Sequence, residues 1–65
     1  MKLNIMSFKI MLAKNMIGIP ELASLTKISM QTLYSYSKGK RNPSTKNIGK
    51  ISKALKCSVE DLVEM

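Results

Sequence analysis

Turn-forming residues interrupt this chain at short intervals and leave room only for short helices. Gly18, Pro20, Gly39 and Pro43 separate its apolar stretches, and Gly and Pro are the residues that most strongly mark helix ends and turns. Between them, apolar residues recur at the three- and four-residue spacing of a helix packed on one side, and no stretch alternates as a strand would. The pattern predicts an all-α fold with five helical segments, over about 4–15 (beginning at Asn4 or Ser7), 19–26, 29–38, 44–55 and 58–63.

Sixty-five residues are enough for one small domain, which we expect to span residues 1–65. A chain of this length buries only roughly 60% of the surface that its unfolded form exposes, so its core is small. It has no His and a single cysteine, Cys57, which excludes an internal disulfide and the zinc-binding patterns. No base is available to activate a Ser or Tyr. We therefore expect no enzyme activity, no cofactor and no metal.

The charge is strongly basic and unevenly distributed. Residues 1–56 hold all eleven basic residues and only one acid, Glu21, so this stretch carries a net charge of +10. A compact body with this charge favours a polyanionic partner, nucleic acid before an acidic membrane surface. A merely solubilising lysine-rich surface is the alternative. The longest apolar run, residues 10–13, is far too short to span a membrane.

Composition also indicates the compartment and the source of the protein. A lone cysteine is typical of a reducing compartment, and the excess of Lys over Arg with many Ile residues suits an AT-rich genome. We expect a cytoplasmic protein of bacterial or phage origin, acting at the nucleoid or in a phage-infected host.

The second and third segments follow the plan of a helix-turn-helix. A short helix, a turn of about three residues and a second helix occupy about 19–38. Two steeply crossing helices need a small residue where they approach, and Ala23 is placed for this. Ile28 in the turn and Leu33 in the next helix are placed to seal the joint. An ordinary helix pair in a bundle remains the alternative on geometry alone.

The order of motifs resembles the Cro and phage-repressor type of helix-turn-helix, the Xre-like family. The resemblance covers nearly the whole chain and rests on Leu22-Ala23, Ile28-Ser29, Leu33, Tyr36, the run 39–44, the fourth segment 48–55 and the closing run 58–62. It implies a compact five-helix, lambda-repressor-like DNA-binding domain whose helix-turn-helix is formed by helices 2 and 3. The third helix is then expected in the major groove, with dimers on two-fold-related half-sites.

The chain departs from that family pattern at several positions. Lys27 and Lys56 stand where Gly is common, so a left-handed backbone there would cost ~1–2 kcal/mol. Ile19 replaces a frequent DNA-contacting Gln. Leu12 and Ser37 replace a frequent Arg–Glu pair, which predicts an apolar joint with no unpaired buried charge.

The third helix is predicted to present one side to DNA. At 100° per residue, Gln31, Ser35 and Lys38 lie opposite Leu33 and Tyr36, which point towards the core. Gln can pair bidentately with an adenine edge. Tyr36 is expected in the core with its hydroxyl at the edge.

Other residues of the third helix border this side. Met30 lies at the border and could press on a thymine methyl group or pack inward. Tyr34 flanks the exposed side and could cover a sugar-phosphate. The resemblance places the base-contacting positions of the family at Ser29, Met30, Gln31 and Ser35.

A basic turn follows the third helix. Lys38, Lys40 and Arg41 are three cations in four residues around Gly39, and such a turn can reach the phosphates that flank a groove. Arg41 is the stronger candidate for a bidentate phosphate or a minor-groove contact. The resemblance makes the residues after Gly39, including Asn42, backbone contacts. The alternative is a solvated loop that is basic by chance.

Two other surfaces are less defined by the sequence. Lys46, Lys50 and Lys53 line one side of the fourth segment, and we expect that side to be solubilising. The acidic last segment is removed from the basic residues in sequence, and Val63 and Met65 are its candidate dimer contacts.

These observations predict a sequence-specific, double-stranded DNA-binding regulator of transcription, most simply a homodimeric repressor on a palindromic operator. The alternative is an antitoxin-like or adaptor module whose helices bind a toxin or another partner protein. RNA binding is less favoured, because only Tyr34 and Tyr36 could stack on bases and Tyr36 is expected in the core.

Overall fold

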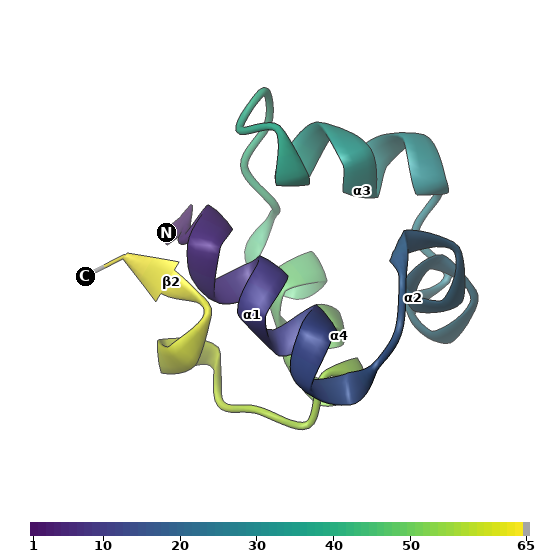
Figure 1. Ribbon diagram of the computed structural model, residues 1–65. Coiled ribbons are helices and arrows are strands. Elements are labelled where there is room, and N and C mark those ends of the chain that lie inside the picture. The colour runs from purple at the N-terminus through teal and green to yellow at the C-terminus, as the bar shows by residue number, and fades with distance from the viewer. Residues whose placement is uncertain (65) are drawn as a thin grey trace.

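Four helices and a small two-stranded sheet make up the domain (Figure 1). The computed structural model describes residues 1–64, within extents of 27 × 22 × 19 Å. In chain order the elements are β1 (Lys2–Leu3), α1 (Ile5–Asn15), α2 (Ile19–Thr26), α3 (Met30–Ser37), α4 (Thr45–Ala54), the 3-10 turn η1 (Val59–Asp61) and β2 (Val63–Glu64). Met65, named above as a candidate dimer contact, lies outside the described residues.

The predicted fifth helix is wrong. Its start does form, because the Asp61 carboxylate accepts from the Ser58 backbone N–H at 3.3 Å and from the Ser58 hydroxyl at 2.9 Å. The turn nevertheless ends after the three residues of η1. The Leu62 carbonyl then accepts from the Asn4 backbone N–H at 2.7 Å. The backbone therefore bonds to the start of the chain instead of continuing a helix.

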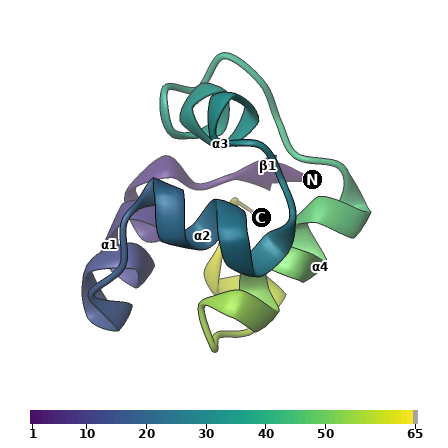
Figure 2. The same ribbon diagram turned by 90° about the vertical axis from the view of Figure 1, so that its right-hand side faces the viewer.

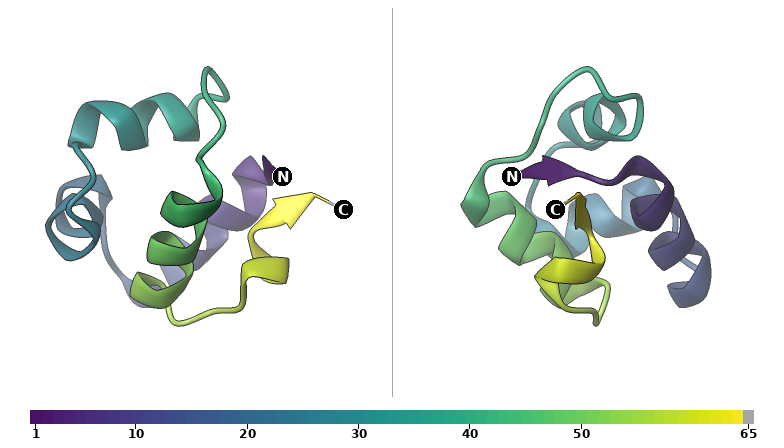
Figure 3. Two further views of the ribbon diagram at one scale, coloured as in Figure 1. Left: turned by 180° about the vertical axis from the view of Figure 1, so that it is seen from behind. Right: turned by 90° about the vertical axis from the view of Figure 1, so that its left-hand side faces the viewer.

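The all-α prediction is corrected by the sheet. β1 and β2 are antiparallel, with Lys2 opposite Glu64 and Leu3 opposite Val63. Figure 3 shows that this pairing brings the two ends of the chain side by side. Strands of two residues are too short to show the alternating pattern by which strands are recognised in a sequence.

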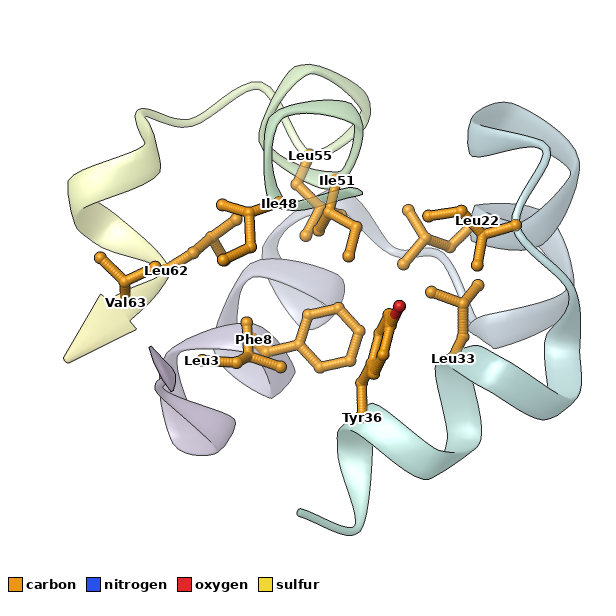
Figure 4. Close-up of a cluster of buried hydrophobic side chains, with 11 residues drawn as sticks. Leu3, Phe8, Leu22, Leu33, Tyr36, Ile48, Ile51, Leu55, Leu62 and Val63 are labelled. Atoms are coloured by element: carbon orange, nitrogen blue, oxygen red, sulfur yellow. The ribbon is translucent and has the colours of Figure 1, made fainter. Parts of the chain in front are cut away.

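The core lies between the helices, and Figure 4 shows the rings of Phe8 and Tyr36 side by side within it. α2 packs against α3 and α4, and α1 packs against α3. The buried hydrophobic residues are Leu3, Phe8, Leu22, Ile28, Leu33, Tyr36, Ile48, Ile51, Leu55, Leu62 and Val63. On α1, Phe8 is buried, whereas Ile5 and Leu12, at three- and four-residue spacing from it, are half-buried.

Polar side chains define where the helices begin. Ser29 and Ser44, where two of the predicted helical segments begin, accept from the backbone N–H of Thr32 and of Asn47, each at 3.2 Å. Asn4 caps α1 in the same way, through the Ser7 N–H at 3.0 Å. Each cap satisfies a donor that the first turn of a helix leaves without a partner.

The positions where the family favours Gly adopt the left-handed backbone that Gly favours. The φ angles are 62° at Lys27 and 56° at Lys56. Leu12, at the other departure, packs against the core, and Ser37 donates its hydroxyl to the Tyr34 carbonyl at 2.8 Å. The joint between α1 and α3 is thus built without a charge pair at these two positions.

Candidate nucleic-acid interface

The helix-turn-helix consists of α2, the turn Lys27–Ser29 and α3. Ile28 in the turn is buried. Thr26 ties the turn to α2, because its hydroxyl donates to the Leu22 carbonyl at 2.7 Å and accepts from the Ile28 N–H at 3.3 Å. α3 lies across one end of the molecule in Figure 1, and Figure 2 shows the same helix nearly end-on. This arrangement leaves one side of α3 uncovered.

The division of α3 into a buried and an uncovered side is confirmed. Leu33 and Tyr36 face the core, whereas Gln31 and Lys38 are exposed. Of the two positions for Met30, the structure shows the outward one, with 48% of the residue exposed. Contact of this side with DNA stays a prediction.

The uncovered side forms a shallow hollow of about 380 Å³, lined by Gln31, Tyr34, Ser35, Lys38 and Lys40. Four of these residues come from α3 or its C-cap, and Lys40 reaches it from the following loop. Tyr34, at 46% exposure, flanks the hollow as predicted. No acid is among the lining residues, so no carboxylate in the hollow repels an anion.

The serines of the predicted base-contacting set are partly engaged within the chain. The Ser29 hydroxyl donates to Thr32 Oγ1 at 2.8 Å, and the Ser35 hydroxyl donates to the Gln31 carbonyl at 3.1 Å. In these positions each serine offers a base edge only its acceptor lone pairs. Gln31 has an exposed amide with both donor and acceptor, and it is therefore the strongest candidate for reading a base.

The basic turn is fixed at its start and exposed beyond it. The N–H groups of Gly39 and Lys40 donate to the carbonyls of Tyr36 and Ser35 at 3.1 and 3.0 Å. Gly39 has a φ of 75°, and a Cβ there would lie 2.9 Å from Ile5 Cδ1. The side chains of Lys40 and Arg41 are exposed. The glycine thus sets the direction in which this turn presents its cations.

Asn42 has a structural contact that the sequence pattern did not predict. Its Oδ1 accepts from the Leu3 N–H at 3.4 Å, which links the loop to β1. The side-chain NH₂ group of Asn42 lies on the same loop as Ser44, the cap of α4. Asn42 is therefore an anchor of the loop as well as a candidate phosphate contact.

Two polar partners behind the interface were also missed. Thr32 holds Ser29 through the two hydrogen bonds given above, and Asn47 donates its amide to the Tyr36 hydroxyl at 3.1 Å. The spacing of Ser29 and Thr32 is that of a cap and its third residue, which is a usable signal. The Tyr36–Asn47 pair joins two helices and has no such local signal.

The candidate dimer contacts lie elsewhere. Val63 is 8% exposed and belongs to the core cluster, so its side chain is not available to a second copy. The nearby Cys57 is half-buried, and burial, followed by the Asp61 carboxylate, raises the pKa of its thiol.

Other kinds of site were sought in residues 1–64. Their helices are too short, or not apolar enough, to cross a membrane. The same residues contain no group of three or more His, Cys, Asp or Glu side chains arranged to hold a metal ion.

Comparison with known proteins places this geometry in a family. The profile of the family described as "Cro/C1-type HTH DNA-binding domain" matches residues 8–65. No curated protein matches the chain. The match includes the whole helix-turn-helix, the basic turn and α4. The chain therefore belongs to the Cro/C1-type helix-turn-helix DNA-binding family.

Proposed function

We propose that this protein regulates transcription by binding a specific double-stranded DNA sequence through the uncovered side of α3. The observation that carries the proposal is the hollow where Gln31 and Ser35 lie beside Lys38 and Lys40, with no acid in its lining. Amide and hydroxyl groups suit base edges, and lysines suit the flanking phosphates. Membership in a DNA-binding family supports the same partner.

Within this proposal, one set of residues on α3 and its cap reads bases, and a second set from α3, its C-terminal end and the following loop holds the backbone. Gln31 is the main reader, with Ser29, Met30 and Ser35 in support. Tyr34, Lys38, Lys40, Arg41 and Asn42 bind phosphates or the minor groove. The action is occupancy of a site and requires no catalytic step.

We further propose a homodimer on a palindromic operator that represses by occluding a promoter, in the cytoplasm of a bacterium or of a phage-infected host. A single small domain reads few base pairs, and a second copy on a two-fold-related half-site doubles the contacts. The side chain of Val63 is not part of this proposed contact, because it packs in the core.

A selection of bound duplexes from a random pool tests the proposal. The expected outcome is an enriched inverted repeat whose half-sites lie about one helical turn apart, roughly 34–36 Å. If each copy neutralises about four phosphates, the logarithm of affinity falls against the logarithm of salt concentration with a slope near −7. No enrichment, or equal binding of an RNA pool, contradicts the proposal.

Repression needs its own test. The selected site is placed across the start of a reporter gene, and expression is compared with and without the protein. Occlusion predicts reduced expression that is restored when the half-sites are scrambled. Increased expression from the intact site would indicate activation instead.

A further inference from the structure

A second hollow lies away from the uncovered side of α3. It has a volume of about 670 Å³ and is formed where the C-terminal ends of α1, α2 and α4 converge. In Figure 1 the C-terminal ends of α1 and α4 lie at the end of the molecule opposite α3. We call it the lysine groove; its lining residues are Asn15, Ile17, Leu25, Thr26, Lys27, Lys50, Lys53, Ala54 and Lys56.

The lysine groove combines an apolar floor with a cationic rim. Ile17, Leu25 and Ala54 supply the apolar part, and Leu25 is 61% exposed in spite of its size. Four lysines surround them, and no acid lines the groove. Of the four acids in the chain, Glu21 is already bonded to the Gly18 N–H and Asp61 to Ser58. The groove lining itself holds no carboxylate that would neutralise the four lysines.

Two of these lysines stand where the backbone favours glycine. Lys27 and Lys56 both have left-handed φ angles, a conformation that costs a residue with a side chain more than it costs Gly. Both side chains line the same groove although they belong to different turns. Met16, at the end of α1, has the same conformation and does not line the groove. The feature that Lys27 and Lys56 share is that the charges of both line one groove.

Helix ends do not account for these charges. Cations are favoured near the C-terminal ends of helices because carbonyls there lack partners. Here, the Leu55 carbonyl accepts from Asn15 Nδ2 at 2.9 Å, and the Ala23 carbonyl accepts from the Lys27 N–H at 2.9 Å. Lys50 lies before the last turn of α4, yet it lines the groove as well. The rim is more extensive than capping requires.

We propose that the lysine groove binds an acidic segment of a partner protein whose apolar side chains rest on Ile17, Leu25 and Ala54 and whose carboxylates meet the lysines. The charge of the groove selects the occupant. A second copy fits poorly, because Leu62 and Val63, the apolar residues beside its own acids, are buried in its core. The apolar residues of this open groove suit the side chains of a peptide segment that lies across them. This inference goes beyond the proposed function, since the lysine groove shares no lining residue with the hollow on the uncovered side of α3.

The test uses the full chain and a labelled synthetic peptide in which a leucine–phenylalanine pair is flanked by glutamates. A matched peptide replaces the apolar pair by serines and keeps every charge. Fluorescence anisotropy gives the affinities, and amide chemical shifts of the unmodified protein locate the binding. We expect the first peptide to bind more tightly and to shift residues around Leu25 and Ala54.

Two double variants of equal charge separate the groove from general attraction. K50Q with K53Q removes two lysines of the rim, whereas K9Q with K46Q removes two exposed lysines that do not line it. Gln keeps a helix propensity close to that of Lys. The groove variant should weaken peptide binding by about tenfold, which corresponds to two modest ion pairs, and the control by less than about twofold.

Several outcomes would overturn the proposal. These are equal loss in both double variants, equal binding of the serine peptide, and amide shifts centred on α3. Displacement of the peptide by the selected operator duplex would also overturn it, because the groove would then belong to the DNA surface. A failure of operator binding leaves the peptide result unaffected, so the two proposals are tested separately.

Discussion

Asn47 Nδ2 donates a hydrogen bond of 3.1 Å to the hydroxyl of Tyr36 and so joins α4 to the buried side of α3. The ring of Tyr36 lies in the core beside Phe8 (Figure 4). One polar contact at the edge of an apolar cluster therefore helps to hold the candidate reading helix in place. That contact can be removed without changing the shape of the core.

Tyr36→Phe should lower the free energy of unfolding by about 0.5–1.5 kcal/mol, the usual net contribution of such a bond. Asn47 is half-buried, so its freed amide regains water and the loss stays moderate. Urea unfolding measures the change. Tyr34→Phe is the matched control, because Tyr34 is exposed and should change stability by less than about 0.5 kcal/mol. Equal effects of the two variants would contradict the proposed role of the contact.

Two glycines should respond to alanine in opposite directions. Gly39→Ala places a side chain at a φ of 75° and 2.9 Å from Ile5 Cδ1, and it should destabilise by about 1 kcal/mol. Gly49→Ala should stabilise by about 1 kcal/mol, because Gly49 lies in α4 with nothing within 4 Å of an added Cβ. Thermal unfolding of both variants gives the sign, and two shifts in the same direction would refute this reasoning.

The left-handed lysine of the turn should tolerate glycine better than alanine. Lys27→Gly relieves the conformation at a φ of 62° and should raise the free energy of unfolding by about 0.5 kcal/mol after the greater freedom of the unfolded chain is included. Lys27→Ala loses the same charge without that relief. The difference between the two variants in urea unfolding isolates the backbone effect, and it should favour glycine.

Substitutions of Gln31 and Arg41 should affect DNA binding in different ways. Gln31→Ala should reduce discrimination at one base pair of the selected operator by ~1–3 kcal/mol and leave binding of unrelated DNA unchanged. Arg41→Ala should weaken binding to all duplexes alike and reduce the magnitude of the salt slope by about 1 for each copy. Competition assays at several salt concentrations measure both quantities. The reverse outcome would exchange the assigned roles.

Stability should fall at alkaline pH in part because of Cys57. Burial and Asp61 raise the pKa of this thiol in the folded state, so the folded protein holds the proton more tightly than the unfolded chain. The resulting stability is complete below the unfolded pKa, about 8.5, and is lost as the pH rises from there through the folded pKa. Cys57→Ala should show a smaller loss between these limits in urea unfolding. Identical pH profiles would contradict this assignment.

Local features of the fold could be predicted, whereas contacts between distant segments could not. Ser29, Ser44 and Gly39 act within one turn of their own positions, so a short sequence window contains their effect. The 3-10 turn begins at Ser58, where the fifth helical segment was predicted to start. It does not continue as a helix, because the Leu62 carbonyl accepts from the Asn4 N–H near the other end of the chain. No window that contains Ser58 alone carries that information.

The candidate interface divides in the same way. The exposure of Gln31 and Lys38 follows from helical periodicity, and it was predicted. The lysine groove was not, because Lys27 and Lys56 appeared only as unusual turn residues and Lys50 and Lys53 only as a solvated side. These lysines lie on three separate elements or turns, and only the folded arrangement brings them together.

The pairing of β1 with β2 joins the first and last elements of the fold. Residues 2–3 and 63–64 hold each other, so removing either stretch leaves the other without its paired strand. The bond between Asn4 and Leu62 lies directly beside this pairing. Conversely, a short covalent bridge between these neighbours would tether them without crossing the face of α3. Backbone hydrogen bonds thus hold together the first and last elements of the domain, segments that in many domains are poorly ordered.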